Sequence, residues 1–175
     1  RECPVSAFSV AVVPVTAFAQ NCTILMCNNT KQAAVIDPGG EVGRIKQQLE
    51  KMGATARKIL LTHAHIDHAG GTAELARELD LTIEGPHEGD LFWIQSLPQQ
   101  SAMFGFPAVE SFTPDRWLND GDEVEVGELT FRVIHAPGHT PGHVVFYNPQ
   151  QTLAFVGDVL VYGPNCPTEF PGGER

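Results

Sequence analysis

The stretch THAHIDH, residues 62–68, brings three histidines and one aspartate together in a single short segment. The chain of 175 residues has only seven histidines, so a large share of them lies here. By composition alone, the pattern H-x-H-x-D-H would arise roughly once in two thousand such chains. Because imidazole and carboxylate groups are the common ligands of zinc-like ions, the stretch predicts a metal site. A hydrated polar loop is the alternative interpretation.

The spacing of the cluster indicates how its side chains could share ions. Side chains of an extended segment repeat every two residues, so His63 and His65 should project to the same side and could bind one ion. Asp67 and His68 are adjacent and cannot point the same way as a simple pair. They could instead hold a second ion just beyond the first.

Two further candidate ligands stand at the ends of predicted strands. His139, in PGHTPGH, lies in a loop restricted by glycine and proline, and Asp158 ends the segment AFVGD. A zinc site needs at least a third protein ligand, which His139 could supply. A carboxylate such as Asp158 can bridge two metals that share one hydroxide.

Hydrophobic periodicity predicts strands, helices and then more strands around these motifs. The expected strands are 8–15, 22–27, 33–36, 58–62, 81–85, 122–126, 129–135, 144–148 and 153–158, with turns at 28–31 and 37–40. Helices are expected at 41–52, with Gly53 as C-cap, and at 70–80. This order predicts an α/β fold of layered sheets with helices outside, formed by a single domain over residues 1–175.

The region 86–120 gives a weaker pattern. DLFWIQSL could be helical, with Pro98 breaking the helix and MFGFP forming a loop. Its aromatic residues could line a pocket or serve as packing for an inserted helix. Cys22 and Cys27 differ by an odd number of positions on one predicted strand, so they should face opposite sides as core residues.

Composition narrows the classes of partner and compartment. The net charge of −10 argues against nucleic acid or anionic lipid, and no apolar run is long enough for a membrane span. The four cysteines have no C-x-x-C spacing, which favours a reducing, cytoplasmic compartment. VPVTAFAQ could contain a signal-peptidase site, but interrupting prolines favour a buried strand.

Taken together, VIDPGG, THAHIDHAGG, APGHTPGH and VGD, in this order, resemble the metallo-β-lactamase fold superfamily. VPVTAFAQNC, MFGF and TPDRWLNDGD are similar to glyoxalase II-like hydrolases of the short bacterial YcbL type. The resemblance covers about residues 10–160. It implies an αββα sandwich and hydrolysis of a thioester such as S-lactoylglutathione by a metal-bound hydroxide.

The resemblance also implies a role for each ligand. His63, His65 and His139 would hold the first metal, and Asp67 and His68 the second, with Asp158 bridging. Asp67 and Asp158 would also be the catalytic carboxylates. The ions would be one or two Zn²⁺, with iron or manganese as alternatives. Asp37 would hold residues 62–68, the metal loop, by hydrogen bonds, or would simply form the turn of D-P-G-G.

The end of the chain departs from the family pattern. No histidine follows His143, so the last expected ligand of the second metal is lacking, and Cys166–Glu169 replaces the usual Gly-Arg-x-Asp segment. We therefore expect the C-terminal part of the fold to be incomplete and the second metal site to be weaker. Two alternatives remain: an inactive metal-binding domain, and an iron persulfide dioxygenase that uses His63, His139 and Asp158.

Overall fold

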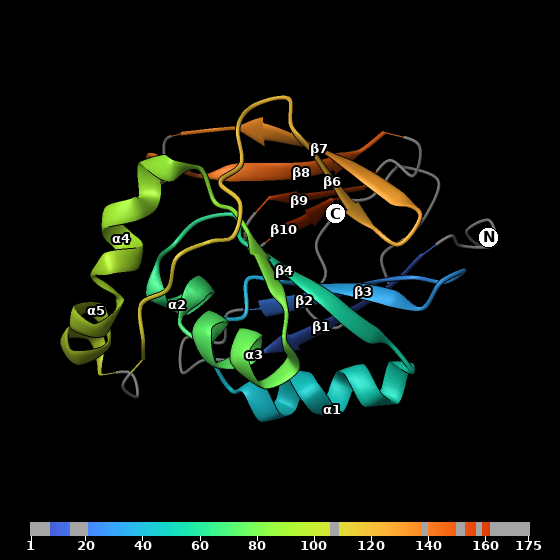
Figure 1. Ribbon diagram of the computed structural model, residues 1–175, viewed down its shortest axis with the longest axis horizontal. Helices are drawn as coiled ribbons and strands as arrows, with labels where there is room; N and C mark the ends of the chain where they lie inside the picture. Colours follow the sequence, from blue (N-terminus) through green and yellow to red (C-terminus); the bar gives the residue numbers. More distant parts are fainter. Residues whose placement is uncertain are drawn as a thin grey trace.

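Two β-sheets lie face to face in the computed structural model (Figure 1). The structure describes residues 8–14, 21–105, 109–137, 140–149, 153–156 and 159–161. The first sheet has the strand order β1-β2-β3-β4-β5 and the second β10-β9-β8-β7-β6. The strands are β1 (Phe8–Pro14), β2 (Asn21–Cys27), β3 (Gln32–Ile36), β4 (Thr55–Leu60), β5 (Thr82–Glu84), β6 (Glu123–Val126), β7 (Leu129–His135), β8 (Val144–Asn148), β9 (Leu153–Val156) and β10 (Val159–Val161).

The first sheet changes direction at β3. Strands β1, β2 and β3 pair antiparallel, whereas β3, β4 and β5 pair parallel. Parallel neighbours need a crossover connection, and the helices α1 (Val42–Met52), α2 (Ile66–Ala69) and α3 (Thr72–Leu79) provide it here. The carboxyl ends of β3 and β4 therefore meet at one edge, where the DPGG turn and the THAHIDH segment begin.

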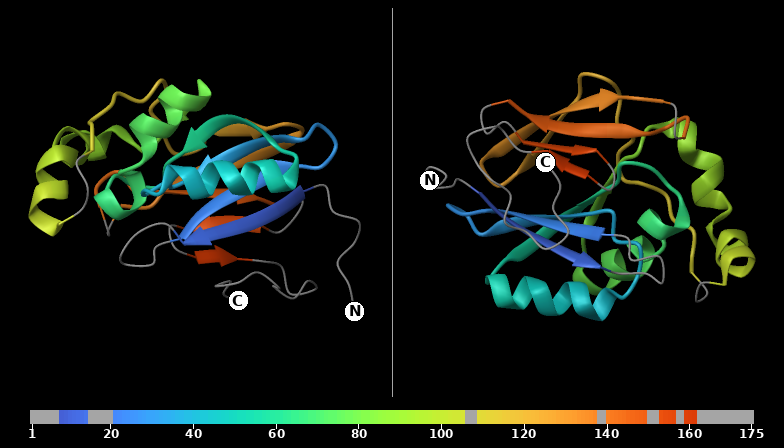
Figure 2. Two further views of the ribbon diagram at one scale, coloured as in Figure 1. Left: turned by 90° about the horizontal axis from the view of Figure 1, so that it is seen from below. Right: turned by 180° about the vertical axis from the view of Figure 1, so that it is seen from behind.

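Helix α1 covers the outer face of the first sheet (Figure 2). Its residues Val42, Ile45 and Leu49 recur at helical spacing and are buried. Gly53 ends the helix in the left-handed conformation, with φ of 68°, as its position after the last apolar residue predicted. The helix 41–52 is thus confirmed apart from its first residue.

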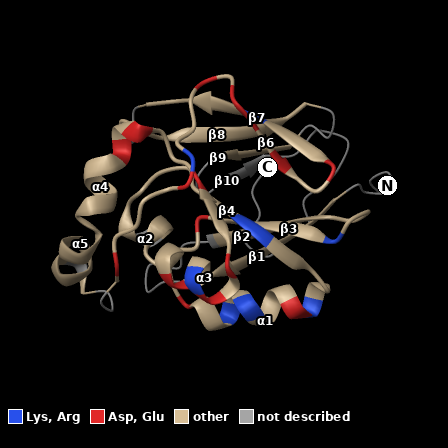
Figure 3. Cartoon of the chain, viewed as in Figure 1, with Lys and Arg blue, Asp and Glu red and all other residues tan. Residues whose placement is uncertain are grey.

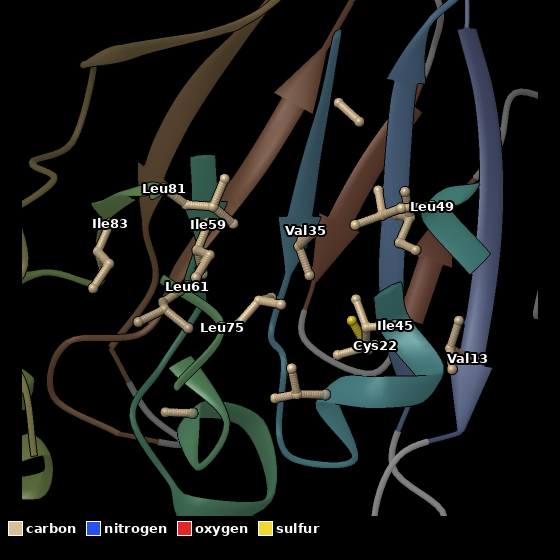
Figure 4. Packing of buried hydrophobic residues seen from close by; sticks show 14 of the residues in the cluster. Val13, Cys22, Val35, Ile45, Leu49, Ile59, Leu61, Leu75, Leu81 and Ile83 are labelled. Atoms are coloured by element: carbon tan, nitrogen blue, oxygen red, sulfur yellow. The ribbon is translucent and has the colours of Figure 1, made fainter. Parts of the chain in front are cut away.

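The strand β2 faces two separate hydrophobic cores. Cys22 and Ile24 point to the core between the first sheet and the helices, which Figure 4 shows from close by. Leu25 and Cys27 point to the core between the two sheets. Both cysteines are buried, and burial raises the pKa of the Cys22 thiol well above its ordinary value. Their predicted role as core residues on opposite faces is confirmed.

A pair of helices, α4 (Leu91–Gln95) and α5 (Leu97–Phe104), forms an arm beside the sheets (Figure 1). The short 3-10 helix η1 (Glu88–Asp90) precedes it. The prediction that Pro98 breaks a helix was wrong in position, because Pro98 lies in the first turn of α5, where a missing N–H costs nothing. MFGFP was expected as a loop, but Met103 and Phe104 belong to α5.

Several predicted boundaries were also wrong. The strand 58–62 begins earlier and ends at Leu60, because it follows β3 in parallel register from Thr55. The helix 70–80 begins only at Thr72, after the separate short helix α2. The segment predicted as strand 153–158 contains β9, and the short strand β10, which pairs with β9, was not predicted.

Some expectations fall on residues that the structure does not describe. Most of VPVTAFAQ, with its possible cleavage site, lies outside the described residues, as does the tail 162–175. No helix in the described ranges combines the length and the apolar character that a membrane crossing requires.

The helix-side core gives a direct test of the fold. Ile45 is fully buried in that core, so Ile45→Ala should lower the free energy of unfolding by about 2–5 kcal/mol through lost contacts and a cavity. Gln47→Ala, on the exposed face of the same helix, should change it by less than about 0.5 kcal/mol. Urea denaturation followed by circular dichroism measures both. Equal effects would contradict the placement of α1.

Candidate metal centre

The segment that follows β4 is held by a row of hydrogen bonds to side chains. The backbone N–H groups of Thr62, Ala64 and Ile66 donate to side-chain oxygens at 2.9, 3.0 and 3.0 Å. The acceptors are Asp37 Oδ1, Asp90 Oδ2 and Gln100 Oε1. Every second N–H is thus directed into the protein, and the segment stays extended without belonging to a sheet.

The histidines alternate with these anchored positions. His63 is buried and His65 is partly exposed, and their ring centroids lie 5.2 Å apart with the planes nearly perpendicular. His65 also contacts Trp93 of α4 edge-on, at 4.7 Å between ring centroids. The expectation that His63 and His65 lie on the same side of an extended segment is therefore in agreement with the structure.

Asp37 is a buried junction beneath the histidines. Its Oδ1 accepts the Thr62 N–H, and its Oδ2 accepts the Thr62 hydroxyl at 2.7 Å. The same Oδ2 lies 3.2 Å from His68 Nδ1. Asp37 also has a φ of 55°, which suits the turn after β3. The sequence left open whether this residue holds the metal loop or forms a turn, and it does both.

These contacts determine the tautomers of two buried imidazoles. The single hydroxyl proton of Thr62 goes to Asp37, so the hydroxyl oxygen must accept from His63 Nδ1 at 3.0 Å. His68 Nδ1 likewise donates to the Asp37 carboxylate. In the neutral form, both rings then carry their proton on Nδ1 and offer the lone pair of Nε2. Metal-binding histidines are typically oriented in this way.

His68 reaches the site from the short helix α2. Its ring centroid lies 4.2 Å from that of His63. After α2, Gly70 and Gly71 pass close to the DPGG turn, and the Gly71 N–H donates to Pro38 O at 2.8 Å. A Cβ atom on Gly70 would lie 2.7–2.8 Å from two backbone oxygens, so only glycine fits. These glycines thus allow α2 to pack closely against the DPGG turn.

Asp90 joins this loop to a second one. It is fully buried at the end of η1, and besides Ala64 it binds Thr140 and Gly142. Sequence reasoning missed it. The available signal was an aspartate directly before the apolar run Leu91–Ile94, which is typical of a helix N-cap. In the structure its carboxylate makes no capping bond and turns to the loops instead.

The other candidate ligands are described only in part. His139 and Asp158 lie outside the described residues, and of Asp67 only the backbone, within α2, is described. His143, expected to be a structural residue of its loop, stacks on His63 at 4.9 Å between ring centroids. His87 and His135, which had no assigned role, stack on each other at 4.0 Å.

Asp37, His63 and His68 could hold a metal ion. Each offers one ligand atom, these atoms lie within 4.8 Å of one another, and all three residues are buried. Both oxygens of Asp37 already accept hydrogen bonds, however. Asp37 therefore suits the orientation of the imidazoles better than direct coordination. The donor set, two neutral imidazoles with oriented Nε2 atoms, fits a zinc-like ion.

Comparison with known proteins agrees with this geometry. Residues 15–174 match the family described as the metallo-beta-lactamase superfamily. The chain belongs to the metallo-beta-lactamase superfamily. The family and the layered α/β fold expected from the motifs are thereby confirmed, and so is the prediction of a metallo-hydrolase.

Individual relatives place the chain within this superfamily. It is 41% identical to the hydroxyacylglutathione hydrolase GloC of Haemophilus influenzae, over 95% of this chain and 78% of that protein. It is 31% identical to a hydroxyacylglutathione hydrolase of Bdellovibrio bacteriovorus, over 94% of this chain and 57% of that protein.

Solved structures agree in fold. BLEG-1 B3 metallo-beta-lactamase has a TM-score of 0.76 and 30% identity, over 95% of this chain and 79% of that one. TTHA1623, in a di-iron-bound form, has a TM-score of 0.75 and 32% identity, over 92% of this chain and 78% of that one.

The Asp37 junction can be tested by unfolding. Asp37→Ala should lower the free energy of unfolding of the metal-free protein by at least about 2 kcal/mol more than Asp80→Ala. Both aspartates have positive φ, 55° and 57°, so alanine is strained at both positions. Only Asp37→Ala leaves buried donors without their acceptor. Urea titrations in a chelator compare the two, and equal losses would contradict the junction.

Proposed function

We propose that this protein is a metal-dependent hydrolase of thioesters such as S-lactoylglutathione. The observation that carries the proposal is the orientation of the two buried imidazoles, His63 and His68, whose Nδ1 atoms are fixed by Thr62 and Asp37. The substrate class is supported by the similarity to enzymes named hydroxyacylglutathione hydrolase, at 41% and 31% identity. Cytoplasmic location and the absence of nucleic-acid partners stay predictions.

Within this proposal, His63, His65 and His139 would hold a first metal. Asp67 and His68 would hold a second, and Asp158 would serve as a ligand to both. A bound divalent ion would supply a Lewis acid that polarises a carbonyl and makes water ionise near neutral pH. Support for this assignment comes from His63, His65 and His68, whose rings gather at the carboxyl end of β4.

The protein residues have the task of fixing which ring nitrogen of each neutral imidazole is available and of keeping it aligned. The Thr62 hydroxyl accepts a hydrogen bond from His63 Nδ1–H, and the Asp37 carboxylate accepts one from His68 Nδ1–H. Neither ring therefore needs to reorient when an ion arrives. The backbone anchors at Thr62, Ala64 and Ile66 restrict the movement of the whole segment. Such preorganisation lowers the entropic cost of binding.

The arm of α4 and α5 is suited to an organic substrate. Neither helix contains a charged residue, as Figure 3 shows. Leu91, Phe92 and Met103 are exposed on the arm, at 41%, 51% and 76%. Trp93 connects it to the site through its contact with His65. We propose that this uncharged surface contacts the apolar part of the thioester, which would give Phe92 and Trp93 a role beyond packing.

Metal removal provides the main test. Protein stripped of metal with a chelator should lose hydrolysis of S-lactoylglutathione and regain it on addition of Zn²⁺, because no serine or cysteine nucleophile takes part. His65→Ala should lower kcat/KM by roughly 100-fold or more, beyond the cost typical of residues that merely support ligands. Glu74→Gln, on the exposed side of α3, should be close to wild type. Turnover is followed by loss of thioester absorbance.

The same samples discriminate the alternatives. Full activity in the stripped protein, or in His65→Ala, would contradict the proposal. Oxygen consumption with glutathione persulfide and one iron per chain would support the dioxygenase instead. A chain that binds metal but turns over no thioester of any kind would be the inactive metal-binding domain considered above.

A further inference from the structure

Asp90 occupies a position that the family motifs do not account for. Its side chain is fully buried, and it lies between Ala64 of the first loop and residues 140–142 of the second. Its Oδ2 accepts the Ala64 N–H at 3.0 Å and the Thr140 hydroxyl at 2.8 Å. Its Oδ1 accepts the Gly142 N–H at 2.7 Å. One carboxylate therefore joins the two loops directly.

The two loops are the ones that carry the proposed ligands of the first metal. Ala64 lies between His63 and His65 in the sequence, and Thr140 follows His139 directly. A displacement of either loop relative to Asp90 would therefore change the separation of these ligands. The 62–66 segment has three anchors, Asp37, Asp90 and Gln100. Among the hydrogen bonds of the described residues, only those of Asp90 reach the second loop.

The surroundings leave little room for rearrangement. A Cβ atom on Gly142 would lie 2.5 Å from His87 O and 2.6 Å from Asp90 N, so the second loop rests directly on the backbone of η1. The His87 N–H donates to Gly142 O at 3.0 Å. Within the described part of the chain, no lysine or arginine forms an ion pair with Asp90. The side-chain hydrogen bonds of Asp90 in the described structure are the three from Ala64, Thr140 and Gly142.

We propose that Asp90 is a positioning residue that sets the metal affinity and coordination geometry by fixing the distance between the two ligand-bearing loops. The proposal rests on the metal centre described under Proposed function. A carboxylate is needed because all three neighbours are donors, and an ionised carboxylate only accepts. An asparagine would turn an NH₂ group towards at least one of these donors.

The test measures metal binding without turnover. The probe is Co²⁺, whose visible absorption depends on coordination geometry, titrated in competition with a chromophoric chelator. Asp90→Asn should bind Co²⁺ roughly 10- to 100-fold more weakly than wild type, with an altered visible spectrum, as is typical when a partner that orients metal ligands is lost. A wild-type spectrum and affinity in this variant would overturn the proposal.

Asp115→Asn is the matched control. The Asp115 carboxylate also accepts a backbone N–H, from Ile83 at 2.8 Å, but its hydrogen bonds in the described structure are to Ile83 alone. The affinity and the Co²⁺ spectrum of Asp115→Asn should equal those of wild type. A loss in Asp115→Asn as large as that in Asp90→Asn would show a general response to lost carboxylates and would overturn the proposal.

A second pair of variants decides the matter if Asp90→Asn does not fold. Thr140→Val removes only the hydroxyl that donates to Asp90, whereas Thr140→Ser retains it. Weaker Co²⁺ binding in Thr140→Val, restored in Thr140→Ser, is the expected result, and equal affinities would contradict it. A wild-type protein that binds no Co²⁺ would overturn the metal centre as well. Normal Co²⁺ binding without thioester hydrolysis would contradict only the proposed substrate.

Discussion

The centre of this molecule depends on the need to satisfy backbone N–H groups that lie outside any sheet or helix. Between the end of β4 and the start of α2, the chain is mostly buried and extended, and in the described structure only the Leu61 N–H and the Thr62 carbonyl oxygen bond to neighbouring strands. An unsatisfied N–H there would be costly. The N–H groups of Thr62, Ala64 and Ile66 instead donate to three side chains. His63 and His65, at the alternate positions, are therefore fixed on the opposite side.

The three acceptors come from distant parts of the chain. Asp37 stands at the end of β3, Asp90 at the end of η1 and Gln100 within α5. They are separated from their donors by 25, 26 and 34 residues. The metal loop therefore takes its shape only when the first sheet, the crossover helices and the α4–α5 arm are all in place. Such a site is rigid because several independent elements determine it.

Sequence patterns predict the parts of the fold that obey local periodicity. An apolar run identified β2, the two-residue period of a strand predicted the opposite directions of Cys22 and Cys27, and helical spacing identified α1. The period of two also predicted how His63 and His65 lie. Asp90 and Gln100 were not predicted, because a hydrogen bond from a side chain to a distant backbone N–H leaves no periodic trace. The prediction for Pro98 was wrong for a different reason, because a proline marks a helix start as readily as a break.

Hydrogen bonds, in addition to packing, attach the arm to the metal loop. Gln100 of α5 accepts the Ile66 N–H with its oxygen, and its amide donates to Trp93 O at 2.9 Å, so one side chain joins both helices of the arm to the loop. A change in the arm that moved Gln100 would also release the metal loop. In evolutionary terms, the arm and the loop that carries the imidazoles are free to diverge only together. Under the proposed function, a new specificity would be reached most readily by exchanging exposed side chains such as Phe92 and Met103, with the helices kept in place.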